Sequence, residues 1–337
     1  MNTLGLTLLA TVVVVMCASC GDNDKSSDSQ QYEAVIHSPA FRSITDSINK
    51  MPDDPRPLLI RALRLSQQNL HKFATADYKK AYELTGDEGV ALEYASNLLL
   101  AGEVKEALAL LEEASERFGG NTEFNRRLAE IYVQNGADEK ALEELNKIIA
   151  KDDSNFEAWY EKGVLLLRTK DTAASIEALE HSFSLLPINL SGMALANIYV
   201  AQKNPRALEI CNTLLSNDTA NVQTEPVYMK GVYYTEVKEY GNAIKQFDEC
   251  IRRDWKMTDA YIEKGIIFYE QKKYDEALKI FDLASTVSNT DADVYYWMGR
   301  CYEEKGNRQE ALTNYRRALA LDETLSEAKN AIRRLNS

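Results

Sequence analysis

Apolar side chains along this chain recur every three or four residues, and short polar breaks divide the pattern into pairs of segments. The last complete pair reads "ADVYYWMGRCYEEKGNRQEALTNYRRALALDE". Its first segment keeps this spacing up to Tyr302, "KGN" interrupts it, and a second segment runs from Ala311 to Leu321. Because this spacing marks one face of an α-helix, each pair predicts two helices joined by a turn.

The pairs repeat along the chain with a period of 34 residues. A column of small residues shows the period, with one-residue slips early in the chain and at its fifth member. Its members are Ala62, Ala95, Ala129, Gly163, Ala196, Gly231, Gly265 and Gly299. We therefore predict eight repeats over residues 55–325, starting near 55, 88, 122, 156, 189, 224, 258 and 292.

Two further columns follow the first, one small and one large. The small column, twelve residues later, holds Ala74, Ala107, Ala141, Ser175, Ala243, Ala277 and Ala311. The large column, four residues beyond it, holds Tyr78, Leu111, Leu145, Leu179, Phe247, Phe281 and Tyr315. Small residues let helices approach closely and large ones fill the remaining space, so we interpret all three columns as core packing.

These columns resemble the tetratricopeptide repeat (TPR), most clearly in "WYEKG" at 159–163 and "ALTNYRRAL" at 311–319. The resemblance covers nearly the whole chain after the N-terminal segment. It implies an all-α fold, a right-handed TPR superhelical solenoid of about eight helix-turn-helix repeats. Terminal repeats need a cover for their apolar face, so we expect capping helices in 31–54, as a half repeat, and in 326–337.

The N-terminal segment has a different pattern. A mostly apolar run from Leu4 to Met16 ends at "CASC" (17–20), and Gly21 to Gln30 contains no apolar side chain. The run is too short to span a bilayer and has the length of a signal-peptide core. It resembles a bacterial lipoprotein signal, which implies removal of residues 1–19, a diacylglycerol group on Cys20 and a flexible tether over 20–30. A secretory signal without lipid, or a short anchor helix, is the alternative.

Composition limits the partners and the role of the cysteines. The net charge is −13 and the isoelectric point is about 4.9, which disfavours binding to nucleic acid. Cys211, Cys250 and Cys301 fall on apolar helical positions, where buried thiols are expected. A bridge between Cys211 and Cys250 is a less favoured alternative, because spacing alone does not establish the required geometry.

No arrangement of residues suggests catalysis. His37, His71 and His181 lie in different parts of the pattern, without metal-type spacing to cysteine or carboxylate. Phosphate-binding glycine loops and nucleophile elbows are also missing from the sequence. We therefore predict a protein that is not an enzyme and needs no metal or cofactor.

The resemblance implies a protein-binding concave groove, lined by the first helix of each repeat. By position, the groove residues are Tyr160, Val164, Met193, Asn197, Tyr228, Val232, Ile262, Ile266, Tyr296 and Arg300. Its acidic edge is Glu157, Glu225, Asp259 and Asp293. This chemistry predicts extended or helical partner segments with apolar anchors flanked by basic residues. The alternative is that the tyrosines only pack against the neighbouring repeat.

Together these features predict a lipid-anchored adaptor or scaffold that assembles or positions a complex of the bacterial cell envelope. The N-terminal lipid would hold it on a membrane, expected to be the outer membrane, with its leaflet left open. Two other functions stay open. One is a chaperone or carrier for exported polypeptides, and the other is a glycan-binding lipoprotein resembling the SusD family, although the regular period leaves no long insertions for a sugar platform.

Overall fold

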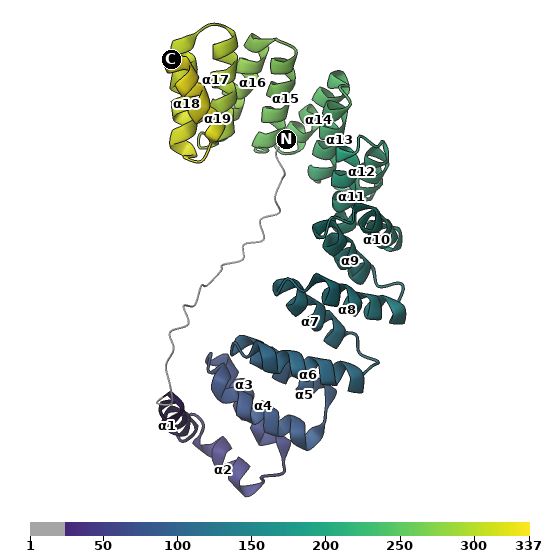
Figure 1. The fold of residues 1–337 in the computed structure, drawn as a ribbon, viewed down its shortest axis with the longest axis vertical. Coiled ribbons are helices and arrows are strands. Elements are labelled where there is room, and N and C mark those ends of the chain that lie inside the picture. The colour runs from purple at the N-terminus through teal and green to yellow at the C-terminus, as the bar shows by residue number, and fades with distance from the viewer. Residues whose placement is uncertain (1–23) are drawn as a thin grey trace. The chain divides into compact units, whose positions relative to one another are not determined.

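A computed structural model describes residues 24–337, and this part of the chain is built from α-helices and short turns (Figure 1). Nineteen helices in the described residues stack as helix pairs, which confirms the predicted all-α TPR solenoid. The predicted signal peptide and Cys20 lie outside the described residues. Residues 24–30, which we predict to be tether, belong to the first helix.

The helix bounds follow the period found in the sequence. The first helices of the eight repeats start within one residue of the predicted positions. In chain order the helices are α1 Asp24–Ile36, α2 Arg42–Lys50, α3 Pro55–Gln67, α4 His71–Thr85, α5 Glu88–Leu100, α6 Val104–Arg117, α7 Glu123–Gln134, α8 Asp138–Lys151, α9 Phe156–Arg168, α10 Thr172–Leu185, α11 Asn189–Ala201, α12 Arg206–Asn217, α13 Glu225–Glu236, α14 Tyr240–Arg253, α15 Thr258–Glu270, α16 Tyr274–Val287, α17 Ala292–Glu304, α18 Arg308–Leu321 and α19 Ser326–Asn336.

The helices form two compact units, one ending at Leu128 and the other running from Ala129 to Ser337. In the first unit, α1 and α2 are fastened to the first repeat through a buried ion pair. Arg61 on α3 donates from Nε and Nη2 to the two carboxylate oxygens of Asp77 on α4, at 2.7 Å each. Arg61 also donates to Thr45 Oγ1 on α2 at 3.0 Å and to the Tyr32 hydroxyl on α1 at 3.3 Å.

In the second unit, three glycines of the small column, Gly231, Gly265 and Gly299, each lie against a large ring of the paired helix. A methyl group added at Gly265 would lie 2.4 Å from Cε1 of Phe281, and one at Gly231 would lie 2.5 Å from Cε1 of Phe247. Carbon atoms in contact sit about 3.5–4 Å apart, so only glycine fits behind these rings as they stand. The columns therefore have the packing role that the sequence predicts.

Neighbouring repeats in the second unit are linked by polar pairs thirty residues apart. Each pair joins the first turn of a second helix to the end of the next repeat's first helix. The Tyr240 hydroxyl donates to Glu270 at 2.8 Å, and the Tyr274 hydroxyl donates to Glu304 at 3.3 Å. Arg168 pairs in the same way with Asp138. These links join each repeat to the next at the same place.

The C-terminal helix α19 packs against α18 at the end of the second unit. Ala328 and Ala331 are buried against the last repeat. Arg334 donates from Nη2 to Glu303 at 2.7 Å, and Glu303 also accepts the Tyr315 hydroxyl at 2.7 Å. The cap is thus held by both apolar contact and charge.

The cysteines at 211, 250 and 301 are fully buried and free, so the alternative bridge between Cys211 and Cys250 is not formed. Burial raises the pKa of each thiol to about 12. The neutral thiol is therefore the stable form at physiological pH.

Across residues 24–337, no helix combines the length and the apolar character needed to cross a membrane.

Candidate protein-binding face

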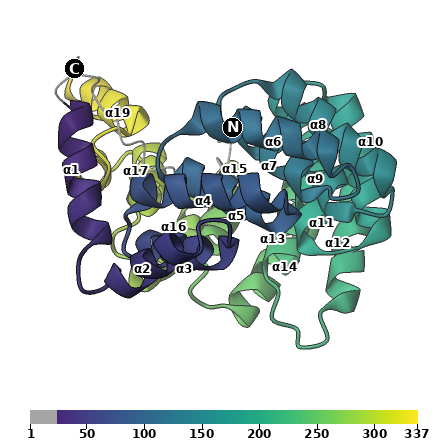
Figure 2. The same cartoon turned by 90° about the horizontal axis from the view of Figure 1, so that it is seen from below.

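The first helices of the last five repeats lie next to one another in the second unit. α9 contacts α11, α11 contacts α13, α13 contacts α15 and α15 contacts α17 (Figures 1 and 2). We call the solvent side of these five helices the first-helix face. All ten predicted groove residues come from these helices.

The predicted groove residues differ in how much of each side chain reaches solvent. Val164 is 41% exposed, and Asn197 is also exposed. Ile262 is only 8% exposed and belongs to the core around α17, so its side chain does not lie on the face as predicted. The others are partly buried, namely Tyr160, Met193, Tyr228, Val232, Ile266, Tyr296 and Arg300.

The four predicted acidic-edge residues are all exposed, and each lies in the first turn of its helix. They are Glu157 on α9, Glu225 on α13, Asp259 on α15 and Asp293 on α17. Helix N-termini carry partial positive charge, so carboxylates stabilise these first turns whether or not they also contact a partner. Their placement is consistent with both roles.

An apolar pocket of about 220 Å³ opens between α7 and α9. Two predicted groove residues, Tyr160 and Val164, form part of its wall. The full lining is Ala129, Glu130, Val133, Leu145, Tyr160, Glu161, Val164, Leu165 and Arg168. Most of this surface is aliphatic or aromatic, with polar groups at the rim. We call it the α7–α9 pocket.

The corresponding position between α15 and α17 is filled by the side chain of Arg300. Its guanidinium carbon lies 5.0 Å from the ring centre of Tyr269 and 5.4 Å from that of Trp297. It donates from Nη2 to the Tyr269 hydroxyl at 2.8 Å and from Nη1 to the Tyr296 hydroxyl at 3.1 Å. Cation–π contact and hydrogen bonds therefore hold Arg300 within the protein rather than leaving it extended toward a partner.

A carboxylate that sequence reasoning missed, Glu263, lies on α15 one turn after Asp259. Burial, and then the charges of Asp259, Glu270 and Glu236, raise its pKa to about 7. Asp259 and Asp293 lie at the exposed edge, but partial loss of contact with water, and then nearby carboxylates, also raise the pKa of each. Part of each shift comes from neighbouring carboxylates, so acidic groups are crowded together at this place.

Basic side chains do not neutralise this group. Within residues 24–337, Glu263, Asp259 and Asp293 form no ion pair with lysine or arginine. The same carboxylates at 263 and 259, after burial, raise the pKa of the Tyr228 hydroxyl on α13. Glu263 lies two residues before Gly265 of the small column and directly after Ile262, which we predicted to line the groove. Including the next position of each repeat in the predicted groove would have identified it.

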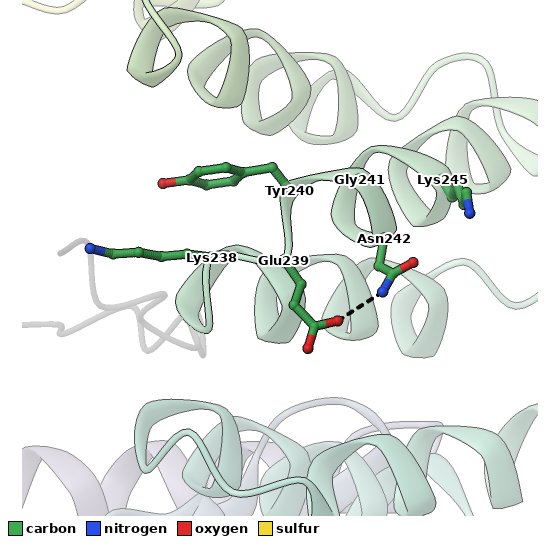
Figure 3. Close-up of a pocket in the computed structure, with 6 residues that line it drawn as sticks. All are labelled: Lys238, Glu239, Tyr240, Gly241, Asn242 and Lys245. Atoms are coloured by element: carbon green, nitrogen blue, oxygen red, sulfur yellow. Dashed lines mark hydrogen bonds between the residues drawn. The ribbon is translucent and has the colours of Figure 1, made fainter.

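A second hollow, of about 460 Å³, lies over the turn between α13 and α14 (Figure 3). All six residues that line it come from one continuous stretch, 238–245. Figure 3 shows Lys238 and Tyr240 pointing to one side and Lys245 to the other, while Asn242 donates to Glu239 at 2.8 Å. The side chains do not converge on one point, so we assign no ligand to this hollow.

Metal-binding geometry is also missing from the described residues. No three His, Cys, Asp or Glu side chains among residues 24–337 are grouped so that they could hold an ion. The first-helix face thus offers apolar surface and negative charge, which suit binding to another polypeptide.

Four stretches of the sequence match models of the tetratricopeptide repeat, at residues 98–165, 156–189, 228–286 and 292–325. Together they cover more than half of the chain. The chain is a tetratricopeptide repeat protein. No curated protein matches the sequence of this TPR protein.

Two solved structures are similar to this TPR protein in fold. One is the C-terminal part of a TPR repeat-containing protein from Cytophaga hutchinsonii, with 15% identity and a TM-score of 0.55, covering 71% of this chain and 98% of that one. The other is PilW, described as a widely conserved type IV pilus biogenesis factor, with 14% identity and a TM-score of 0.52, covering 63% and 98%. At these identities the likeness shows the fold alone.

Proposed function

We propose that this TPR protein is a lipid-anchored adaptor that binds protein segments on its first-helix face and assembles or positions a complex of the bacterial cell envelope. The observation that supports binding is the combination of an open apolar pocket with carboxylates that have no basic partner among the described residues. An open apolar pocket favours being covered by a partner, and carboxylates without a basic partner attract a positively charged one. The TPR family, whose members are typically scaffolds for protein partners, agrees with this reading.

The proposed partner segment carries large apolar residues next to lysine or arginine. Apolar residues would contact the half-buried tyrosines and valines of the face, whereas the basic residues would meet Glu263, Asp259 and Asp293. Opposite charge across the interface would speed association and select against acidic segments. The net charge of −13 adds a long-range component to the same preference.

The membrane part of the proposal comes from the sequence. "CASC" at 17–20 and the polar stretch after it support a lipid on Cys20 that holds the repeats close to an outer-membrane surface. A single acyl chain binds a membrane only weakly, whereas the several chains of a lipoprotein anchor would hold it firmly.

One experiment addresses binding and anchoring together. The chain is tagged at its C-terminus, cross-linked in native cells, and isolated from detergent-solubilised membranes beside a Cys20→Ser variant. One stoichiometric set of envelope proteins would support the adaptor, while a broad mixture of exported chains would favour a chaperone. Recovery of the unaltered chain alone, from the soluble fraction, would contradict both the adaptor and the anchor.

A further inference from the structure

We propose that an uncharged apolar surface around the turns after α10 and α12 binds a second copy of this chain, with Val222 of each copy seated in a pocket of the other. The surface consists of Leu185, Leu186, Ile188, Leu190 and Val222, and we call it the turn patch. It is centred on turns between repeats and not on the first-helix face, so the inference is independent of the proposed function.

The turn patch gathers exposed apolar side chains from two neighbouring turns. Leu185, Leu186, Ile188 and Leu190 are each 36–43% exposed, and Val222 is 70% exposed. Both turns join the second helix of one repeat to the first helix of the next, so they lie at the same edge of the stack (Figure 1). Grouped apolar surface of this kind on a folded protein marks contact with another molecule.

A pocket of about 270 Å³ opens between the two turns. Its wall includes Leu186, Pro187, Ile188, Leu214, Asn217 and Gln223. Val222 directly precedes Gln223, so a projecting apolar side chain stands next to an apolar hollow. A cavity of about 150 Å³ holds benzene, and 270 Å³ therefore has room for a valine side chain. A two-fold axis brings the projection of each copy to the hollow of the other, because such an interface pairs every contact reciprocally.

The loop that carries Val222 is held in place from within the protein. Asp218 accepts hydrogen bonds from the backbone N–H groups of Val222 at 3.2 Å and Gln223 at 2.9 Å. Arg253 donates from Nη1 to Asp218 at 3.2 Å and to the Gln223 carbonyl at 2.7 Å, and both charged side chains are buried. A loop that is already ordered loses little conformational freedom on binding, so Val222 is presented at low entropic cost.

The lack of charge in the turn patch favours a second copy as its partner. No Asp, Glu, Lys or Arg occurs from 182 to 202, and from 210 to 224 the one charged residue is Asp218, whose side chain is 3% exposed. Two copies that each carry a net charge of −13 repel one another, so they must meet where charge is missing. The patch also lacks the lysine and arginine residues that attract anionic lipids.

The surroundings of the turn patch fit the rim of an interface. A standard interface buries about 800 Å² on each partner, with an apolar core and a polar rim. Exposed polar side chains without charge flank the patch in the same two turns, namely Ser184, Ser216, Asn217, Thr219 and Asn221. They extend the uncharged surface beyond the five apolar residues and supply hydrogen-bonding groups for the rim.

The test is fluorescence-detected sedimentation of the full chain in mild detergent, with a small labelled population and increasing amounts of unlabelled chain. We expect the unaltered chain to form dimers as its concentration rises. Val222→Glu and Ile188→Lys should each weaken dimerisation by about a hundredfold or more, because the contact occurs twice and each change buries an unpaired charge. Leu283→Glu is the matched control, since Leu283 is 52% exposed on α16, and it should dimerise like the unaltered chain.

A mixture of the two variants separates loss of the contact from loss of the fold. In the mixed dimer, the introduced glutamate of one copy meets the introduced lysine of the other, while the second contact keeps Val222 against Ile188. Labelled Ile188→Lys should therefore bind unlabelled Val222→Glu at least about tenfold more tightly than either variant binds itself. Far-UV circular dichroism checks that every variant is folded.

A chain that stays monomeric at every concentration would overturn the proposal. Dimers that both variants leave unchanged would overturn it too, and so would a mixture that binds no more tightly than the separate variants. If the chain is monomeric and Val222→Glu lowers the recovery of a different protein after native cross-linking, the patch binds that protein and the second copy is wrong. A monomeric chain would leave the proposed adaptor function untouched, because the recovery of envelope proteins tests that function separately.

Discussion

Replacing Gly265 by alanine tests whether the small column exists because of the ring behind it. The new methyl group would lie 2.4 Å from Cε1 and 2.6 Å from Cζ of Phe281, whose side chain is fully buried. The ring must move by about 1 Å to restore normal carbon contact. Overpacking of this kind costs about 1–3 kcal/mol, whereas alanine gains about 1 kcal/mol over glycine inside a helix.

We therefore expect Gly265→Ala to lower the free energy of unfolding by about 1 kcal/mol. Leucine at 281 reproduces the combination found at Ala129 and Leu145, so in a Phe281→Leu background the same change should raise stability instead. The two effects of Gly265→Ala should differ by about 2 kcal/mol, a coupling expected for residues in contact. Gly241→Ala is the control, since Gly241 lies in the first turn of α14 with no atom within 4 Å of an added methyl group.

Urea unfolding followed by circular dichroism measures these changes. Hydrogen exchange of the α15 and α16 amides shows where the loss occurs, because a repeat array need not unfold as one unit. If Gly265→Ala is as stable as the unaltered chain, or changes stability equally with Phe and with Leu at 281, the contact does not explain the column.

Three further predictions concern charge. Asp77→Asn should lower the free energy of unfolding by about 3–5 kcal/mol, because it leaves Arg61 buried without its counter-charge. Urea unfolding measures this loss. The double variant Arg61→Met, Asp77→Leu should recover most of it. The pKa of Glu263, about 7, is above the ordinary 4.5, so the folded chain holds this proton more tightly than the unfolded chain. Stability should then fall as pH rises from about 4.5 through 7, and Glu263→Gln should flatten the change between urea midpoints at pH 5 and pH 8. Charge reversal of Asp259 and Asp293 should slow association with a basic segment at low salt, as stopped-flow mixing would show.

Each of these has a contradicting result. A loss below about 1 kcal/mol for Asp77→Asn would mean that water reaches Arg61. If the urea midpoint depends on pH equally with glutamate and with glutamine at 263, another group causes the change in stability. Unchanged on-rates after charge reversal would remove steering from the binding proposal.

The fold could be predicted from the sequence because the same pattern of small and large core positions recurs in most repeats. Gly265 and Phe281 were recognised as core partners from their columns, and the structure brings them into contact. The buried ion pair of Arg61 and Asp77 was not foreseen, since it occurs in one repeat only and period analysis averages such features away.

The first-helix face was less predictable for a related reason. A position assigned to the groove by family pattern can be buried by its own neighbours, as Ile262 is at 8% exposure. Arg300 was predicted to face a partner, but the aromatic side chains of Tyr269 and Trp297 hold it. The α7–α9 pocket depends on a difference between repeats, the small Val133 in place of tyrosine, and a search for similarity passes over differences.

The pairs thirty residues apart have a consequence for how such a chain can change its length. Tyr240 and Tyr274 occupy equivalent places, and so do their partners Glu270 and Glu304. An in-frame duplication or deletion of one 34-residue unit would therefore present each tyrosine with an equivalent glutamate from its new neighbour. These hydrogen bonds between repeats would therefore be kept after such recombination. The number of repeats can then change, by drift or by selection, without loss of the contacts between them.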